Sequence, residues 1–245
     1  MRPNTQRLTT FDVLKLLTGL LILRIVMVVL LSYPDYVPPN FERGFLLDRD
    51  GYFFGSYQWA FYAHITSGPM SLVLGTILLS DKVRRRFPRW HRVLGRVQTI
   101  NVLFLVAPSG LWMSRHAESG LVAGLGFGTL SIATGLCAAL GWRAAVLRRF
   151  SSHQRWMERC FSLLCSAVVL RFIGGSATLA NVDWPWLYPV SAWASWLLPL
   201  MGYEIFQNSL ALKRDQYGQD ADHAKNVHQR KSFPFRVCRG RLRNV

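Results

Sequence analysis

The sequence is poor in acidic residues, in charge of either sign and in paired cysteines. Only 13 of its 245 residues are aspartate or glutamate, against 29 lysines and arginines, and charged residues make up 17% of the chain. Soluble domains average about 25% charged residues, so this composition argues against a soluble globular protein. The four cysteines include no Cys-x-x-Cys pair, so neither a disulfide framework nor a cysteine metal site is indicated.

Long apolar runs take the place of charge. Hydrophobic residues make up 51% of the chain, and six runs each approach or exceed the roughly 17 to 25 residues that cross a bilayer as a helix. The runs are continuous rather than alternating, which favours helices over the strands of a membrane barrel. We predict an all-α polytopic membrane protein with six transmembrane helices and a helical-bundle core formed by the second to fifth spans. The predicted spans are 16–32, 55–80, 97–114, 119–142, 160–181 and 184–203.

The basic residues cluster between the apolar runs, on one side of the predicted membrane. Segments 1–15, 81–96, 143–159 and the tail from residue 204 hold 24 lysines and arginines, whereas the alternate loops hold 3. Cytoplasmic loops of membrane proteins carry the excess of positive charge, so both termini are predicted to be cytoplasmic. Because this topology explains the basic charge, nucleic acid is not expected as a partner.

The topology divides the chain into three predicted parts. Residues 1–15 form a cytoplasmic N-terminus, residues 16–210 the six-helix membrane domain with its core at 55–180, and residues 211–245 a basic, disordered cytoplasmic tail. The arginines of the tail are expected to attract anionic lipid. No small-residue cleavage site follows the first span, which we therefore expect to be a retained signal-anchor helix.

Two residue patterns within the membrane domain call for an interpretation. The glycines of Gly120-x-x-x-Gly124-x-x-x-Gly128 share one face of a helix, which favours close helix packing, with the approach of a flat cofactor as the alternative. Aromatic residues gather where the outer loop meets the second span, and we interpret them as an interfacial belt. These are Tyr52, Phe53, Phe54, Tyr57 and Trp59.

Four of the six histidines fall at particular depths of the predicted spans. His64 lies inside the second span, 17 residues before Asp81, or about 25 Å from the cytoplasmic edge at about 1.5 Å per residue. His116 ends the third span on the outer side, whereas His91 and His153 open the third and fifth spans on the cytoplasmic side. The sequence thus predicts two pairs, His64 with His116 outside and His91 with His153 inside.

Two imidazoles at one depth on facing helices are what haem b requires of a protein, with the second ring nitrogen of each hydrogen-bonded. Haem iron held by these four histidines, in one or two haems b, would carry electrons across the membrane. His91 and His153 as interface anchors, and His116 as an exposed loop residue, remain alternatives. His64 stands apart, because an ionisable residue within a span is costly and by default marks a functional site.

Arg171 lies within the fifth span and needs an anionic partner. It follows His153 by 18 residues, or about 27 Å toward the outside, which brings it near the depth of His64. Its candidate partners are a haem propionate, Asp183 and, by snorkelling, lipid headgroups. Arg24 in the first span also needs an anionic partner, and the sequence does not identify one.

Four stretches of the chain resemble the bacterial predicted membrane proteins of domain of unknown function 2306. They are "FYAHITSGPMSLVLGTI", "RWHRVLGRV", "SGLVAGLGFGTLSIATGLCAA" and "HQRWMERCFSLLCSAVVLRF", and the resemblance covers about residues 55 to 175. It implies a multi-pass protein of the bacterial inner, or cytoplasmic, membrane. The family's pattern has no regular histidine at the position of His116. The residues that match the pattern are His64, Gly68, His91, Arg92, Gly95, Gly120, Gly126, Phe127, His153, Trp156, Met157 and Arg171.

A looser, architectural resemblance is to cytochrome b561, a six-helix diheme family in which histidines of the second and fourth and of the third and fifth spans pair. It implies haem b bound by His64, His91, His116 and His153, with Arg171 offsetting a propionate. Gly68 and Gly95 would let the cofactor approach the helices. The partners would be the lipid bilayer and a small-molecule electron donor, and an oxidoreductase activity would follow only with an acceptor site. The alternatives are a cofactor-free transporter or sensor that uses His64 and Arg171 in a polar cavity, and a structural membrane subunit.

Overall fold

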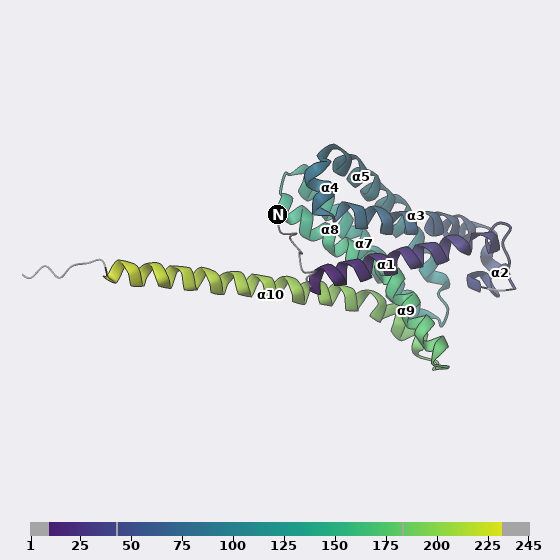
Figure 1. The fold of residues 1–245 in the computed structure, drawn as a ribbon. Coiled ribbons are helices and arrows are strands. Elements are labelled where there is room, and N and C mark those ends of the chain that lie inside the picture. Colours follow the sequence, from purple (N-terminus) through teal and green to yellow (C-terminus); the bar gives the residue numbers. More distant parts are fainter. Residues whose placement is uncertain (1–9, 43, 183, 232–245) are drawn as a thin grey trace, which may run out of the picture. The chain divides into compact units, whose positions relative to one another are not determined.

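The structure is a computed structural model that describes residues 10–42, 44–182 and 184–231. The chain divides into two compact units, Met1–Met201 and Gly202–Val245. Nearly all of the described part is helical and no strand occurs in it; one isolated bridge joins Tyr36 and Pro39. The α-helices are α1 Thr10–Leu31, α2 Asp50–Phe53, α3 Ser56–Leu78, α4 Asp81–Arg86, α5 Pro88–Asn101, α6 Ala107–Met113, α7 Leu121–Val146, α8 Phe150–Leu164, α9 Ser166–Leu179 and α10 Leu187–Lys231 (Figure 1). The shorter helical segments are η1 Tyr33–Asp35, η2 Gly44–Leu46, the π-helix η3 Val102–Val106 and η4 Ser114–His116.

Four stretches of the described chain are long and apolar enough to cross a membrane. They are Leu17–Asp35, Pro88–His116, Leu121–Val146 and Phe150–Leu179, and they correspond to the predicted first, third, fourth and fifth spans. The chain is therefore a membrane protein with several apolar helices. The predicted count of six is not confirmed, because α3 and the start of α10 are helical but carry many serine, glycine, tyrosine and tryptophan residues, which lower their mean hydropathy.

The third span is built from three consecutive helical segments. Helix α5 runs into the π-helix η3, which runs into α6. Pro108 follows the π-helix in α6, and a proline has no N–H for an α-helical bond and its ring crowds the carbonyl four residues earlier. Short π-helical segments are a recognised way to accommodate such a disruption, and they are frequent at functional sites.

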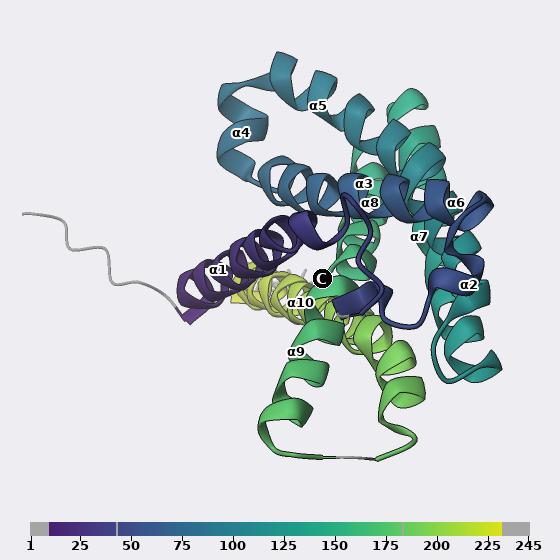
Figure 2. The same cartoon turned by 90° about the vertical axis from the view of Figure 1, so that its right-hand side faces the viewer.

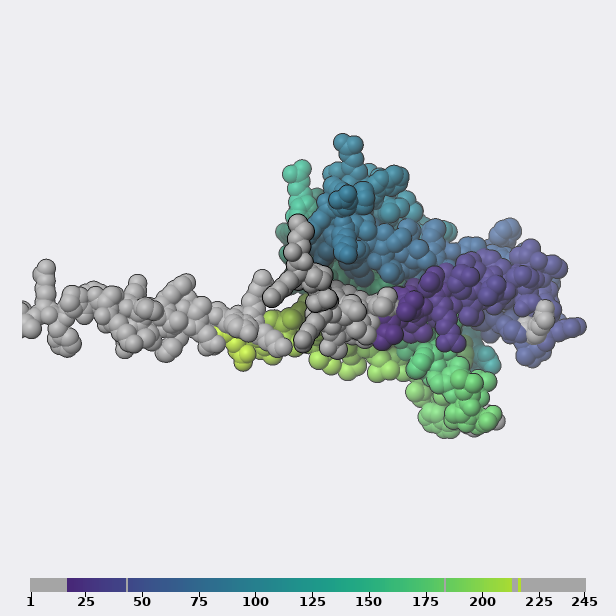
Figure 3. Space-filling view, in the orientation of Figure 1, coloured from purple at the N-terminus to yellow at the C-terminus, as the bar shows by residue number. Residues whose placement is uncertain are grey.

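Helices α3, α5, α7 and α8 lie side by side in the first unit, and α1 and α9 flank them (Figure 2). The α7–α8 pair makes the most extensive contact. Helix α1 packs against α3 and α9, and its outer side chains form part of the face seen in Figure 3. This arrangement agrees with a bundle core formed by the predicted second to fifth spans.

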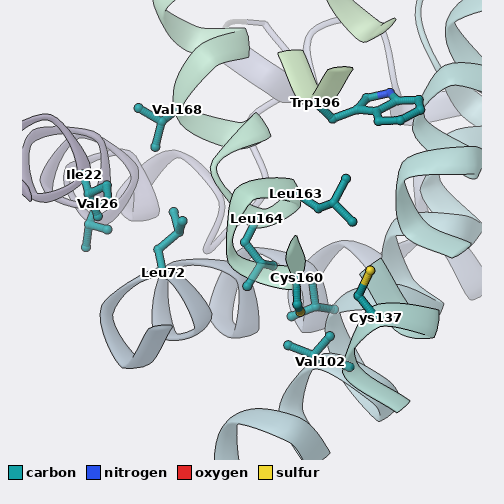
Figure 4. Close-up of a cluster of buried hydrophobic side chains, with 12 residues drawn as sticks. Ile22, Val26, Leu72, Val102, Cys137, Cys160, Leu163, Leu164, Val168 and Trp196 are labelled. Carbon is teal, nitrogen blue, oxygen red and sulfur yellow. The ribbon is translucent and has the colours of Figure 1, made fainter. Parts of the chain in front are cut away.

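A single buried apolar cluster joins these helices (Figure 4). Val102 and Leu163 are almost fully buried in it, and Trp196 of α10 packs there from beyond the fifth span. Most other large apolar side chains of the unit are exposed. That distribution is what a lipid environment permits, since apolar side chains need no burial there.

The glycines of α7 are confirmed as packing positions at two of three sites. A Cβ at Gly124 would lie 2.8 Å from the carbonyl oxygen of Ser114, and one at Gly128 would lie 3.3 Å from the Ser114 hydroxyl. Gly120 instead begins the helix with φ +79, a conformation that favours glycine.

The segment between α1 and α3, residues 32–55, is predicted to be the outer loop, and with the start of α3 it forms a second buried cluster, which corrects part of the predicted aromatic belt. Phe53 and Tyr57 are 0% and 2% exposed and pack with Leu46 and Phe61. Arg49 holds this cap together, because its Nη1 donates to the hydroxyls of Tyr52 and Tyr57 at 3.1 and 3.2 Å. The belt interpretation still suits the exposed Phe54 and Trp59. The rings of Phe53 and Tyr57 are buried because the cap supplies enough aromatic neighbours to exclude solvent.

Helix α10 extends through residue 231, into the segment predicted as a disordered tail. Residues 211–231 contain no proline and one glycine, and they are rich in alanine, lysine, arginine and glutamine, which favour helix. Helix α10 therefore includes residues 211–231, the first part of the predicted tail. Residues 232–245 lie outside the described part.

Candidate functional site

His91 and His153 occupy the same position at the N-terminal start of two helices. Each is the fourth residue of its helix, α5 or α8. Their backbone N–H groups donate to the carbonyls of Phe87 and Arg149, at 3.0 and 2.9 Å. These first-turn bonds fix the backbone of both residues in the same way, so the two histidines share one local structure.

The ring of His153 is held in one orientation by helix α7. Its Nδ1 lies 2.8 Å from the carbonyl oxygen of Gly141. A carbonyl only accepts, so Nδ1 carries the proton and, in the neutral ring, Nε2 keeps its lone pair. Gly141 permits this approach because α8 packs directly on it: a Cβ there would lie 2.7 Å from Met157 Sδ.

His91 lies within electrostatic range of His153 and Arg84. Its Nδ1 is buried and has no hydrogen-bond partner in the described part of the chain. Arg84 also donates to the side chain of Gln154 at 3.2 Å, which ties α4 to α8. The structure thus places the two predicted inner histidines within electrostatic range of each other. One turn on from His91, a Cβ at Gly95 would meet no atom within 4 Å.

His64 belongs to a different environment, between α3, α6 and α7. Its Nδ1 lies 3.0 Å from the Ser109 hydroxyl oxygen. Ser109 uses its own proton on the carbonyls of Leu105 and Val106, so the imidazole Nδ1–H is the donor. The ring also packs on Gly110, where a Cβ would lie 3.3 Å from His64 Cε1.

A cavity of about 140 Å³ lies beside His64. Arg171 of α9 lines the same cavity, and its charge acts on His64. The rest of the lining is mainly apolar, and Gly68 lines it with no atom within 4 Å of a Cβ built there. The predicted association of His64 with Arg171 is therefore formed. The polar lining residues besides these two are Ser131, Thr134 and Ser166.

Arg171 has no carboxylate partner among the described residues. Its Nη1 donates to the carbonyl of Ala167 on its own helix, at 3.1 Å. Tyr36 lies within range of its charge; burial raises the pKa of that tyrosine, and the smaller effect of Arg171 lowers it. Because the net change is upward, the Tyr36 hydroxyl is neutral at physiological pH and provides no counter-charge. Asp183, a predicted partner, lies outside the described residues.

His116 is not brought to His64. It stacks on Tyr52, with ring centroids 4.7 Å apart, and meets the edge of Tyr57 at 5.1 Å. Its backbone carbonyl accepts from Arg49 at 3.4 Å. His64 instead meets Ser109, seven residues earlier than His116, or about 10 Å along a helix. His64 and His116 therefore do not form the predicted outer pair, because the ring of His116 contacts the aromatic residues of the cap instead.

Sequence reasoning missed a buried polar cluster between α3 and α5. Gln98 and Asn101 are 2% and 3% exposed. Asn101 donates to the carbonyl of Ser67 and the hydroxyl of Ser71, at 3.0 and 2.7 Å, and Gln98 donates to the carbonyl of Ser71 at 3.1 Å. The i, i+3 spacing of two amides beside an apolar run was the available signal, since polar side chains hold helices together in membranes.

No group of three or more histidine, cysteine, aspartate or glutamate side chains that could hold a metal ion occurs in the part of the chain described by the structure. The inner pair offers two imidazoles, and the cavity offers one imidazole and one guanidinium.

Comparison with known proteins gives one match. No curated protein and no solved structure matches the chain, so the architectural likeness to cytochrome b561 stays a prediction. Residues 61–206 match the family model described as predicted membrane protein DUF2306. The match covers more than half of the chain and includes His64, the inner pair and Arg171. The protein therefore belongs to the DUF2306 family of predicted membrane proteins.

Proposed function

We propose that the protein binds one haem b at the cytoplasmic end of the membrane domain, between His91 and His153, and takes part in electron transfer. The observation that carries the proposal is the hydrogen bond from His153 Nδ1 to the Gly141 carbonyl, 2.8 Å long. Histidines that ligate a metal almost always donate their other nitrogen to a carbonyl, carboxylate or water, which leaves the ligating nitrogen unprotonated.

The inner pair fits this cofactor in three respects. His153 has its tautomer fixed by Gly141. His91 has a buried ring nitrogen that no described residue satisfies. Gly95 leaves open space on the same face of α5, one turn from His91, where the edge of a flat group could approach the backbone.

The outer histidines do not fit a second haem. His116 is engaged by the Tyr52 and Tyr57 rings. The cavity beside His64 measures about 140 Å³, and a cavity near 150 Å³ holds a molecule of benzene's size. A porphyrin contains four pyrrole rings. We therefore propose one haem instead of two, and not a chain of two haems across the membrane.

The residues around the inner pair would orient and retain the cofactor. Haem b supplies a one-electron redox centre when bound. Gly141 would hold the ring of His153, and the arginines of segment 81–96 would favour both a haem propionate and an anionic small-molecule electron donor. The positive-inside topology that motivates this arrangement would place both termini in the cytoplasm of a bacterial inner membrane, and the basic tail next to anionic lipid.

The test is the absorption spectrum of the purified protein after dithionite reduction, with haem supplied during expression. We expect an α band of haem b and a stoichiometry of one haem per chain by pyridine haemochrome assay. A folded, haem-supplied protein without the band would overturn the proposal, and two haems per chain would overturn its single-haem form.

Variants assign the ligands. His91→Ala and His153→Ala should abolish the band, whereas His64→Ala and His116→Ala should retain it. His153→Met supplies an alternative axial ligand, so it should retain haem with a raised potential and show that the loss in His153→Ala is not a folding defect. Loss of haem in His116→Ala equal to that in His91→Ala would refute the assignment.

A cofactor-free role in transport or sensing is a second candidate. The observation that favours it is that His64 and Arg171, two polar residues in predicted spans, line one cavity. Polar and ionisable residues inside membranes commonly mark substrate pathways.

A further inference from the structure

The cavity beside His64 contains hydrogen-bonding groups that the protein leaves unused. Ser131 of α7 and Ser166 of α9 line it and are 8% and 7% exposed. Neither hydroxyl makes a hydrogen bond within the described residues, whereas the hydroxyl of Thr134 is bonded to its own helix at 2.7 Å. Hydroxyls of residues with so little exposure are normally paired, so these two favour a ligand with oxygen or nitrogen atoms.

The positive charge at the cavity favours a negatively charged ligand. Arg171 contributes a permanent positive charge and makes one hydrogen bond, to the carbonyl of Ala167. Its guanidinium has further donors and no carboxylate among the described residues to receive them. An arginine in a membrane span is stabilised by a negative partner, and guanidinium binds carboxylate through two parallel hydrogen bonds.

The other residues that line the cavity are mainly apolar, which favours a ligand with a hydrocarbon part. Helix α1 contributes Ile25, Val26 and Val29, and α8 contributes Leu163 and Leu164. The volume of about 140 Å³ is close to that of a cavity that accepts benzene. A hydrated inorganic anion would leave this apolar surface without contacts, whereas a hydrocarbon ring would fill it.

We propose that this cavity binds one small lipophilic monocarboxylate of about the size of benzoate. The carboxylate lies against Arg171 and the hydroxyls of Ser131 and Ser166, and the hydrocarbon body lies against α1 and α8. This inference rests on the second candidate function, a ligand cavity, and is independent of haem binding. Because the same chemistry is found in free aromatic acids and in fatty acids, the test separates these two sources.

The experiment measures binding to the full-length protein in nanodiscs of neutral lipid by saturation-transfer NMR and equilibrium dialysis. The probes are benzoate, benzyl alcohol, inorganic phosphate and dodecanoate. We expect benzoate to bind and phosphate not to bind. Tighter binding of dodecanoate than of benzoate would identify the fatty acid as the source, and weaker binding would identify the free aromatic acid.

The binding results distinguish failure of the carboxylate proposal from failure of the second candidate function. Binding of benzyl alcohol without benzoate would overturn the acid and retain a ligand cavity. Binding of neither would overturn both the inference and the second candidate function. Binding of phosphate as tightly as benzoate would overturn the apolar half of the proposal.

A matched pair of variants tests the site itself. Arg171→Gln should weaken benzoate binding on the order of tenfold to a hundredfold, the usual effect of losing a charged hydrogen-bonding partner. Arg24→Gln is the control, because Arg24 also lies in a predicted span but does not line the cavity. Ser166→Ala should weaken binding by about two- to tenfold. Equal weakening by Arg24→Gln and Arg171→Gln would overturn the proposal, and α-helical circular dichroism of both variants verifies that they fold.

Discussion

Substitution of Gly75 by alanine offers a direct test of how α3 packs in the bundle. Gly75 is buried, and a Cβ added to it would lie 2.5 Å from Phe161 Cδ2 and 2.8 Å from Phe161 Cε2. Both atoms belong to a rigid ring, so the overlap cannot be relieved by the far end of a flexible side chain. Gly68 on the same helix is the matched control, because a Cβ there would meet nothing within 4 Å.

Both substitutions gain the helix-forming tendency of alanine, but only Gly75→Ala also causes steric overlap. Replacing glycine by alanine inside a helix stabilises it by about 0.5–1 kcal/mol. Overpacking at a filled site costs about 1–3 kcal/mol. Gly75→Ala should therefore lower the free energy of unfolding by up to about 2.5 kcal/mol, whereas Gly68→Ala should leave it unchanged or raise it by up to about 1 kcal/mol.

The assay is reversible unfolding in mixed micelles by sodium dodecyl sulfate, followed by circular dichroism and tryptophan fluorescence. The double variant Gly75→Ala with Phe161→Leu should be more stable than the sum of the single effects predicts, since the smaller side chain relieves the overlap. Equal stability of Gly75→Ala and Gly68→Ala, without coupling to Phe161, would refute the packing of α8 on α3 at this position.

Two further predictions concern the outer cap and the topology. Arg49→Gln should loosen the aromatic cap and lower the free energy of unfolding by about 1–3 kcal/mol, because it removes the charged hydrogen bonds to the tyrosine hydroxyls and to the His116 carbonyl. Limited proteolysis of the outer loop should be faster in this variant, and it should not be faster in the exposed control Arg115→Gln. With the native cysteines replaced by serine, Glu118→Cys should react with a membrane-impermeant maleimide in intact cells and Ser151→Cys should react only after lysis. The reverse labelling pattern would contradict the proposed orientation.

The helical membrane class could be predicted from sequence because it depends on composition alone. Continuous apolar runs identify the four helical stretches that are long and apolar enough to cross a membrane. Helix α3 and the first part of α10 were also predicted as helices, but their polar and small residues make length and hydropathy insufficient to establish a span. Those residues have a structural use, since Ser67 and Ser71 of α3 receive the amides of Asn101 and Gln98.

Counting residues along a helix puts His91 and His153 at equal depth, and in the structure each is the fourth residue of a helix and they lie within electrostatic range of each other. The same counting does not describe the surroundings of His116. His116 lies in η4, a short connection where the rise per residue no longer gives the depth. Its position is instead set by contacts with an outer loop that is distant in sequence, and such contacts cannot be read from the spacing of one motif.

The cavity shows why a ligand site in a membrane protein is harder to predict than its helices. Arg171 and His64 are visible in the sequence because ionisable residues are rare in apolar runs. Ser131 and Ser166 are not, because serines in membrane helices usually bond to their own helix, as Ser109 does. Only the packing of α7 and α9 reveals that these two hydroxyls lack that bond. A polar residue whose hydrogen bond is formed stabilises the fold. A polar residue without a hydrogen bond inside a cavity of about 140 Å³ lowers stability unless a ligand forms that hydrogen bond. This difference distinguishes a structural serine from a ligand-binding serine.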